Sequence, residues 1–370
     1  MKYVKLKNFC ELKYGKMPDK KKMHDSGKYP VFSGYRVVGY CDECNIEKRE
    51  LIVVARGVGG TGDVKLTPGA CFLTNLSIAV FVDESIALKE YLYYYFQINN
   101  LRYLNSGSVQ SQITVADLKE VVVPIPTLSN QEKIVKILGA FDEKIELNNR
   151  INDNLQQQAH AFYREWFIDY APFGGEAPSE WKRCKLKDVL SLKKRGTKAG
   201  AAPDLPYLPI DTIPMRSFAV TDFRPNEEAQ SSLIRFCKDD IVIGAMRVYF
   251  HRVILAPCDG ITRTTCFTLK PINPAYLAFG LITCDLDSSI DHAQNTSNGS
   301  TMPYAVWDGG MGEIEIAIPP NDVAEKFNAI ILPMLRQIQN SCFEIRALHE
   351  TRDSLLPRLM TGALDVSTID

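Results

Sequence analysis

A chain of 370 residues is long enough for two domains, and 45% hydrophobic with 24% charged residues is an ordinary globular composition, which excludes a wholly disordered protein. The formal net charge of −1 excludes a global positive field, so any nucleic-acid site must be a local concentration of Lys and Arg. No stretch approaches about eighteen uninterrupted apolar residues and the N-terminus has no apolar signal region, so we expect a cytoplasmic protein that is neither secreted nor inserted in a membrane.

The first half of the chain is predicted to begin with short strands. Strand-like runs at residues 29–32, 51–55, 78–82 and 121–125 are separated by Gly, Pro, Asn and Asp, which favour turns. The segment 88–98 is predicted to be a short helix. This order indicates a globular part that is rich in β-structure.

A long helix is predicted to follow. Ser129 and Glu132 have the spacing of a capping box, in which the hydroxyl accepts from the third helical N–H group and the carboxylate reaches back. As one helix, residues 129–166 would be about 57 Å long, which exceeds the dimension of a domain this small. A helix of that length needs a second helix to cover its apolar stripe.

The second half supplies such a helix. After Asp322 and Glu325, which repeat the capping pattern, apolar residues recur at alternating steps of four and three, as they do in the first helix. We predict that the two helices pair antiparallel; the alternative is that each is an ordinary amphipathic helix on its own domain. The polar residues within the seam, which are expected to fix the register at a cost in stability, are Asn148, Asn152, Ser341 and Arg352.

The chain also contains an internal repeat. "KLKNFCELKYGK" from Lys5 matches "KLKDVLSLKKRG" from Lys185 (185 − 5 = 180), and "LKEVVVPIPTLSNQEKI" matches "MGEIEIAIPPNDVAEKF" near the end of each half. Polar Gly-Ser stretches lie between the two phrases in both halves. Because several phrases recur in one order, we infer that a domain has been duplicated.

Residues 57–62, GVGGTG, fit the G-x-G-x-x-G pattern that cradles phosphates in dinucleotide-binding folds, and they follow a strand-like run. A nucleotide-cofactor-binding enzyme that uses this loop is therefore one alternative. In such folds the last glycine opens a helix, whereas Pro68 and Gly69 follow here and leave no room for one before the next strand. We favour a strand–loop–strand connection.

Other catalytic patterns do not occur in the sequence. It contains neither G-x-x-x-x-G-K-[ST] nor H-E-x-x-H, and its five histidines are dispersed. Cys41 and Cys44 form a lone C-x-x-C, for which a reduced structural pair is the expectation rather than a metal site. We expect no catalytic residue, no bound cofactor and no metal in this chain.

The duplicated plan, the "PIP…NQEKI" start of the first long helix, its "FYREWF" close and the "LLPRLMTG" close of the second resemble the specificity subunit of type I restriction–modification systems. The resemblance covers nearly the whole chain. It implies an α+β fold in which two tandem mixed α/β target-recognition domains are separated by a pair of long antiparallel coiled-coil helices, as a pseudo-two-fold internal repeat. The implied boundaries are 1–128 for the first domain, 129–170 for the first spacer helix, 171–320 for the second domain and 321–370 for the second spacer helix with the C-terminal tail.

The resemblance also implies a function. Such a chain would recognise a bipartite double-stranded DNA site, one half with each domain, without being an enzyme itself. Two methyltransferase subunits, which carry S-adenosylmethionine, and restriction/translocase subunits would dock on it, and no membrane would be involved. A coiled-coil adaptor that binds only proteins is the other alternative.

Candidate DNA-contacting residues are assigned by their chemistry. Basic residues at matching places in the two copies are expected to contact phosphates: Lys13, Lys16, Lys193, Lys194, Arg195 and Lys198. Arg can bind guanine and amides can bind adenine, so such side chains are expected at base edges. In the first half these are Arg56, Asn75, Gln110 and Gln112, with Ser108 in the same Gly-Ser loop, and in the second half they are Arg247, Tyr249, Arg252, Arg263 and Ser300.

Overall fold

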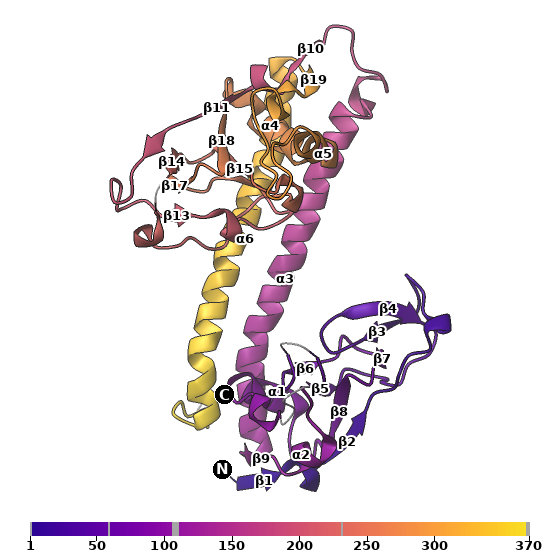
Figure 1. Cartoon of the computed structure of the whole chain (residues 1–370). Coiled ribbons are helices and arrows are strands. Elements are labelled where there is room, and N and C mark those ends of the chain that lie inside the picture. The colour runs from indigo at the N-terminus through magenta and orange to yellow at the C-terminus, as the bar shows by residue number, and fades with distance from the viewer. Residues whose placement is uncertain (1, 58–59, 106–110, 231, 368–370) are drawn as a thin grey trace. The chain divides into compact units, whose positions relative to one another are not determined.

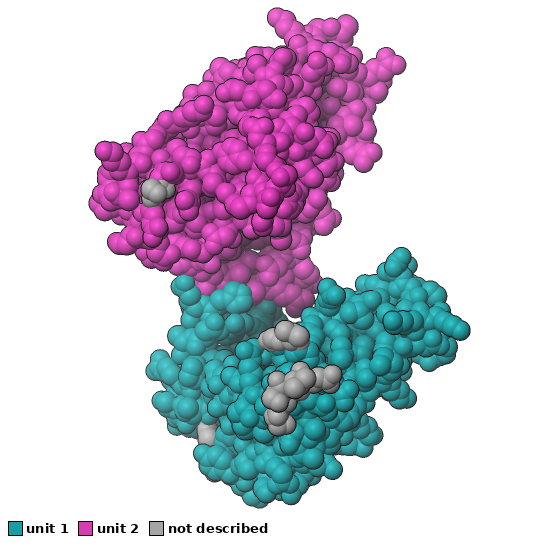
Figure 2. Space-filling view, viewed as in Figure 1, with its two compact units in different colours: residues 1–143, 349–370 teal, residues 144–348 magenta. Residues whose placement is uncertain are grey.

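The computed structural model contains two compact units, and Figure 1 labels their elements. Unit 1 comprises residues 1–143 and 349–370, and unit 2 comprises residues 144–348 (Figure 2). Unit 1 therefore combines the two ends of the sequence. The residues that the structure describes are 2–57, 60–105, 111–230 and 232–367.

The described residues of unit 1 form three sheets. The central one has the order β2–β8–β5–β6, with all neighbours antiparallel. Its strands are β2 (Cys10–Tyr14), β8 (Ser77–Val82), β5 (Leu51–Val54) and β6 (Val64–Leu66). The others are β4 (Val37–Cys41), β3 (Tyr29–Phe32) and β7 (Phe72–Leu73), in that order, and the pair β1 (Lys2–Lys5) and β9 (Val122–Ile125). The four predicted strands are confirmed to within one residue.

Strand β5 lies at the centre of the core of unit 1. Leu51 and Val53 belong to the cluster that helix α1 (Lys89–Ile98) contributes to, whereas Ile52 belongs to a separate cluster. Because successive side chains of a strand point to opposite faces, this burial explains why LIVV is apolar at every position. Helix α1 confirms the helix predicted at 88–98, and a second short helix, α2, spans Val115–Lys119.

Unit 2 is built in the same way. Its central sheet has the order β11–β18–β15–β16, again antiparallel throughout. These strands are β11 (Leu190–Leu192), β18 (Cys266–Pro271), β15 (Ile241–Gly244) and β16 (Val253–Leu255). A second sheet consists of β12 (Gly196–Thr197), β14 (Leu233–Phe236), β17 (Gly260–Arg263) and β13 (Tyr207–Leu208), and β10 (Lys182–Lys185) pairs with β19 (Glu315–Ile318). Helices α4 (Leu277–Asp285) and α5 (Asp287–Asn295) lie between β18 and β19 in the chain.

The strand order supports the inferred duplication. The sheet β2–β8–β5–β6 of unit 1 corresponds position by position to β11–β18–β15–β16 of unit 2, and the pair β1–β9 corresponds to β10–β19. A parallel strand pair also occurs in each unit, β3 with β7 and β13 with β17. The central sheet and the terminal strand pair therefore repeat in one chain order, whereas the remaining sheets differ in strand number and order.

An ion-pair cluster recurs as well. In unit 1, Lys5 and Lys7 lie 2.7 and 2.8 Å from the carboxylate of Glu120. In unit 2, Lys185 and Lys187 each lie 2.6 Å from the carboxylate of Glu313. The hydrogen bonds from these lysines lower the pKa of each glutamate to about 2.

We expect the two glutamates to titrate together and unusually late on acidification. Their contribution to stability is present at neutral pH and is lost as the pH falls below the usual glutamate range toward about 2, because only the ionised carboxylate is bridged. Carboxyl-carbon NMR titration measures both midpoints. In the double variant Lys5→Met/Lys7→Met, the midpoint of Glu120 should return to its usual range and that of Glu313 should not move; equal midpoints in the wild type near the usual range would contradict the bridges.

The two long helices begin one residue before their predicted caps. Helix α3 spans Leu128–Phe167 and helix α6 spans Asn321–Thr361, so α6 begins at the predicted domain boundary of 321. The capping boxes predicted at Ser129 and Asp322 are wrong, because Thr127 Oγ1 accepts from Asn130 N at 3.4 Å and Pro320 O accepts from Ala324 N at 3.0 Å. Both predicted caps therefore already lie inside the first helical turn.

The side chains of α3 and α6 meet within each unit. In unit 2, Asn148 Nδ2 donates to Glu344 Oε2 at 2.9 Å and Asn152 Nδ2 to Cys342 Sγ at 3.7 Å, so the α6 number falls as the α3 number rises and these segments run antiparallel. In unit 1, Arg352 Nη1 donates to Asp142 Oδ1 at 2.6 Å. Of the seam residues singled out in the sequence, Asn148 and Ser341 are buried, and Asn152 and Arg352 are half-buried. Among the described residues, no helix combines the length and apolarity needed to cross a membrane.

Candidate nucleic-acid interface

The glycine-rich segment of unit 1 is a connection between two strands. Strand β5 is followed by β6, which pairs with it antiparallel, so the strand–loop–strand prediction is confirmed. Gly57 and Gly62 have φ angles of 136° and 97°, a region that favours glycine. A Cβ atom on Gly60 would lie 2.3 Å from Cε1 of Tyr35, so that ring packs directly on the loop. The last glycine leads into a strand rather than a helix, which disfavours the dinucleotide-binding alternative.

Four predicted DNA-contacting residues of unit 1 lie together at one end of its central sheet, where β2 and β5 end and β8 begins. The N–H group of Asn75 donates to Lys16 O at 3.1 Å, and the N–H group of Arg56 donates to Leu76 O at 3.1 Å. Arg56 also forms an isolated antiparallel bridge with Gln112. We call the edge formed by Lys16, Arg56, Asn75 and Gln112 the reading edge of unit 1.

The side chains on this edge include an aromatic partner that sequence reasoning missed. The guanidinium carbon of Arg56 lies 6.0 Å from the ring centroid of Tyr14, at the end of β2. Tyr14 is 39% exposed and Arg56 is also exposed, so both groups are accessible from solvent. A cation stacked on an exposed aromatic ring offers a planar donor surface of the kind that binds bases and phosphates.

Lys13 lies apart from that edge. As neighbours in β2, Lys13 and Tyr14 point to opposite faces of the sheet. Lys13 Nζ lies 2.7 Å from Glu11 Oε1 and 5.7 Å from the ring centroid of Phe81. Ser108 and Gln110 lie outside the residues that the structure describes.

Unit 2 carries a corresponding edge. The N–H group of Arg247 donates to Pro303 O at 2.8 Å, which joins the turn after β15 to the loop that contains Ser300. Tyr304 OH donates to Thr264 O at 2.7 Å, next to Arg263 at the end of β17. Lys193, Lys194, Thr264 and Tyr304 line one depression on the surface. The reading edge of unit 2 thus consists of Lys193, Lys194, Arg247, Arg263, Ser300 and Tyr304.

Two predicted contacts in unit 2 are engaged by the protein itself. Arg195 Nη1 donates to Oδ2 of the buried Asp240 at 2.7 Å. Arg252 donates through Nη1 to Ile210 O, and its guanidinium carbon lies 5.3 Å from the ring centroid of Phe250. Both guanidinium groups hold neighbouring segments in place. Lys198 and Tyr249 are exposed.

Equivalent backbone hydrogen bonds show which residues of the two edges correspond. Arg56 N donates to Leu76 O at 3.1 Å in unit 1, and Met246 N donates to the equivalent Thr265 O at 3.3 Å in unit 2. Met246 therefore occupies the place of Arg56, and Arg247 projects from the turn that follows.

Bridges across the edges confirm this register. Arg56 bridges Gln112 and Met246 bridges Tyr304, in each case antiparallel. Tyr304 was missed as a candidate, although aligning the apolar runs "LIVVAR" from Leu51 and "IVIGAM" from Ile241 would have located its neighbourhood. The two edges therefore share a backbone framework but present different side chains, an amide in unit 1 and a phenol in unit 2.

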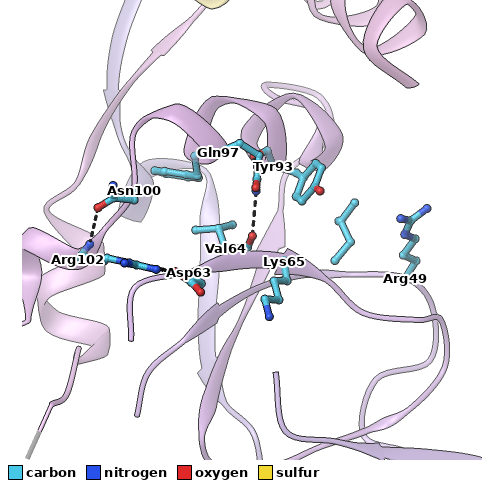
Figure 3. A pocket seen from close by; sticks show the side chains of 10 residues that line it. Arg49, Asp63, Val64, Lys65, Tyr93, Gln97, Asn100 and Arg102 are labelled. Carbon is cyan, nitrogen blue, oxygen red and sulfur yellow. Dashed lines mark hydrogen bonds and ion pairs between the residues drawn. The ribbon is translucent and has the colours of Figure 1, made fainter. Parts of the chain in front are cut away.

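A depression of unit 1 lies between the edge strand β6 and helix α1 (Figure 3). Gln97 Nε2 donates to Val64 O at 3.0 Å, and Arg102 Nη2 lies 3.0 Å from Asp63 Oδ1 (Figure 3). The hydrogen bond from Gln97 satisfies the backbone oxygen of Val64 in β6. The ion pair with Arg102 neutralises the carboxylate of Asp63, which directly precedes this strand. The α1 side chains thereby cover an edge that could otherwise pair with another strand.

The cysteines have the properties of structural thiols. Burial raises the pKa of Cys10 to about 12 and that of Cys71 and Cys266 to about 11, so these thiols are protonated at neutral pH and are poor nucleophiles and metal ligands. Cys41 Sγ donates to Glu43 O at 3.0 Å. In the described part of the chain, no group of three or more His, Cys, Asp or Glu side chains is arranged to hold a metal ion.

The N-terminal part of the chain is similar to a known family. Residues 1–157 match the family described as the type I restriction modification DNA specificity domain. The type I restriction enzyme MjaIX specificity subunit of Methanocaldococcus jannaschii is 24% identical over 364 residues, which cover 88% of this chain and 81% of the relative. The HindI specificity subunit of Haemophilus influenzae is 36% identical over 83 residues, 22% of this chain and 17% of the relative. The resemblance to specificity subunits is confirmed.

A solved structure has a similar fold. The S subunit of a type I restriction–modification system from M. genitalium superposes with a TM-score of 0.72 at 20% identity, covering 97% of this chain and 95% of that one. The mixed α/β fold with its long helices is therefore shared by a known structure over nearly the full length.

Proposed function

We propose that this chain, whose residues 1–157 belong to the type I restriction modification DNA specificity domain family, is the specificity subunit of a type I restriction–modification complex. It recognises a bipartite double-stranded DNA site and is not itself an enzyme. The observation that carries the proposal is the reading edge, which recurs on the same strand framework in both units with different side chains. A shared strand framework allows both units to contact the phosphate backbone in the same way, whereas different side chains allow each unit to bind different bases.

Each reading edge contacts one half of the site. Lysines on the edges, Lys16 in unit 1 and Lys193 and Lys194 in unit 2, contact phosphates, since a flexible ammonium group binds the backbone without regard to sequence. Arg56 and Gln112 in unit 1 and Arg247 in unit 2 reach base edges, where a fork of donors or an amide distinguishes base pairs. With a net charge of −1 for the chain, DNA binding depends on these local groups.

Helices α3 and α6 form the spacer. They pair as an antiparallel coiled coil and hold the two target-recognition domains at a fixed separation, so the gap between half-sites is set by helix length, at about one turn of DNA between centres or somewhat less. Insertions within the helices are expected to change the permitted gap and leave the bases that are read unchanged.

The catalytic partners bind to this scaffold. We propose two methyltransferase subunits, which carry S-adenosylmethionine, and restriction/translocase subunits. This chain contributes selection of the site, and the chemistry belongs to those partners.

Methylome sequencing tests the function. Cells that express the partner methyltransferase should carry one split, methylated DNA motif when this chain is present, and lose that motif when its gene is deleted. An unchanged methylome with the methyltransferase present would contradict the proposal. Stabilisation of the chain by a dinucleotide, or partner binding without DNA selectivity, would support the enzyme or adaptor alternatives instead.

Replacing Arg56 with Ala is expected to relax specificity at one base pair of the half-site read by unit 1. A lost bidentate base contact weakens binding by about 1–3 kcal/mol on the cognate site and by less on a site mutated at that pair. Fluorescence anisotropy on matched duplexes measures both affinities. Arg164→Ala, an exposed residue of α3 in unit 2, serves as the control and should leave the base preference intact. Equal weakening by Arg56→Ala on every duplex would reassign Arg56 to a phosphate.

A further inference from the structure

A buried network in unit 2 lies behind its reading edge. His251 closes the turn that presents Arg247 and Tyr249, and its Nε2 lies 2.8 Å from Oδ1 and 2.7 Å from the backbone O of Asp285. The other carboxylate oxygen, Oδ2, lies 2.8 Å from Nε2 of His160 on helix α3. His251 and Asp285 are 3% and 4% exposed, so this carboxylate joins a helix to a turn in the interior.

The turn depends on this support because its backbone is strained. Val248–Phe250 form one 3-10 turn, and the residues on either side, Arg247 and His251, have φ angles of 51° and 54°. Left-handed conformations are unfavourable for such side chains and persist only where the surroundings impose them. Val248, in the middle of the turn, is buried in the core, and Arg247 N donates to Pro303 O at 2.8 Å, whereas Tyr249 is 44% exposed. The anchor at His251 holds the end of the turn, and it therefore contributes to the direction in which Arg247 and Tyr249 point.

Helix α3 contacts the same network a second time. One turn before His160, Gln156 Nε2 donates to Arg216 O at 2.7 Å, and Arg216 N donates in turn to His251 O at 2.7 Å. Arg216 Nη2 also donates to Asp287 Oδ1 at 2.9 Å. Two residues on one face of α3 thus hold His251 through its side chain and through its backbone.

The charges around His251 favour its protonated form. An ionised carboxylate only accepts hydrogen bonds, so Nε2 carries the proton toward Asp285. Nδ1 is buried and lies 3.5 Å from Asp287 Oδ1. In the neutral imidazole, the unprotonated Nδ1 would direct its lone pair toward this carboxylate, whereas in the protonated imidazole it carries a proton. Burial lowers the pKa of His251, but the hydrogen bond and charge of Asp285 raise it more, against the charge of Arg216, and the net shift is upward.

We propose that Asp285 is the positioning residue for DNA reading by unit 2, which couples the Arg247–Tyr249 turn to helix α3 through His251 and His160. The inference rests on the proposed function. Asp285 does not touch DNA; it fixes the direction of side chains that do. Loss of its charge lets the strained turn relax, so Arg247 and Tyr249 no longer meet the bases in one orientation.

The test compares half-sites. Once the bipartite motif is known, affinities are measured on duplexes with both half-sites intact, or with either one scrambled, and the two ratios give the discrimination by each unit. Asp285→Asn, which keeps the shape and removes the charge, should reduce discrimination at the unit 2 half-site about tenfold or more. Discrimination at the unit 1 half-site should stay at the wild-type value. Asp291→Asn, an exposed carboxylate on α5, is the matched control and should change neither ratio.

The pH profile separates positioning from general loss of structure. With a raised pKa, the charged His251 contact is fully present at pH below about 6.5, and it is lost as the pH rises through the higher folded value. Wild-type discrimination at the unit 2 half-site should therefore fall with rising pH, and His251→Gln, which keeps a donor but does not titrate, should flatten that profile.

Two results would overturn the inference: equal losses at both half-sites in Asp285→Asn, or a wild-type profile that His251→Gln leaves unchanged. The pH profile of His251→Gln tests the inference even if Asp285→Asn does not fold. A wild-type chain that discriminates neither half-site would instead contradict the proposed function, and the two failures are therefore distinguishable.

Discussion

Replacing Phe327 with Ala should lower the free energy of unfolding of unit 2 by about 3–5 kcal/mol. The ring of Phe327 is fully buried on helix α6. It lies 4.8 Å from the ring centroid of Phe167 and 5.7 Å from that of Trp166, both on α3. Truncation removes these contacts and leaves a cavity that a packed aromatic cluster cannot close.

Tryptophan fluorescence during denaturant unfolding measures this effect selectively, because the three tryptophans of the chain, Trp166, Trp181 and Trp307, all lie in unit 2. Phe343→Ala is the matched control, since Phe343 is on the same helix but 39% exposed. That variant should stay within about 0.5 kcal/mol of the wild type. Comparable losses in the two variants would mean that the cluster does not stabilise unit 2.

Replacing Gly15 with Ala should destabilise unit 1 by about 3 kcal/mol. A Cβ atom there would lie 2.2 Å from Thr74 O and 2.5 Å from Leu73 O. Both are backbone atoms, and Leu73 O accepts the hydrogen bond from Lys16 N at 3.0 Å, so no flexible side chain can move aside. The chain must separate at the point where Lys16 and Asn75 meet, and DNA reading by unit 1 should be lost with it.

Hydrogen exchange of peptides from unit 1 measures this loss of stability. Tryptophan fluorescence serves as the reference, because it reports on unit 2. Gly196→Ala is the control from the other unit. Its Cβ would have open space around it, and its backbone is not in the left-handed region, so stability should be unchanged or slightly higher. Faster exchange in Gly15→Ala confined to unit 1 is the expected pattern, and unaltered exchange would contradict the close approach.

The predicted caps of the two long helices were wrong because contacts with distant residues decide where a helix begins. Ser129 and Asp322 fit a capping pattern, yet Thr127 O and Pro320 O already accept hydrogen bonds from the first turns. Gln131 illustrates why, because its buried amide accepts from Leu88 N and fixes the start of α3 against the rest of unit 1. Where a helix begins depends on such distant contacts as well as on its own first residues.

The sequence by itself determined the strands, the long helices, the repeated phrases and the resemblance to specificity subunits, because these signals are local: side-chain period fixes which face is apolar, and a duplicated phrase is visible without coordinates. Only the tertiary structure decided which basic residues are bound by buried partners. Arg195 and Lys193 are two residues apart, yet Arg195 is bound to the buried Asp240, whereas Lys193 lines a surface depression and its ammonium group donates to the hydroxyl of Ser191. The physical reason is that the availability of a charge depends on partners distant in sequence, which neither composition nor periodicity encodes.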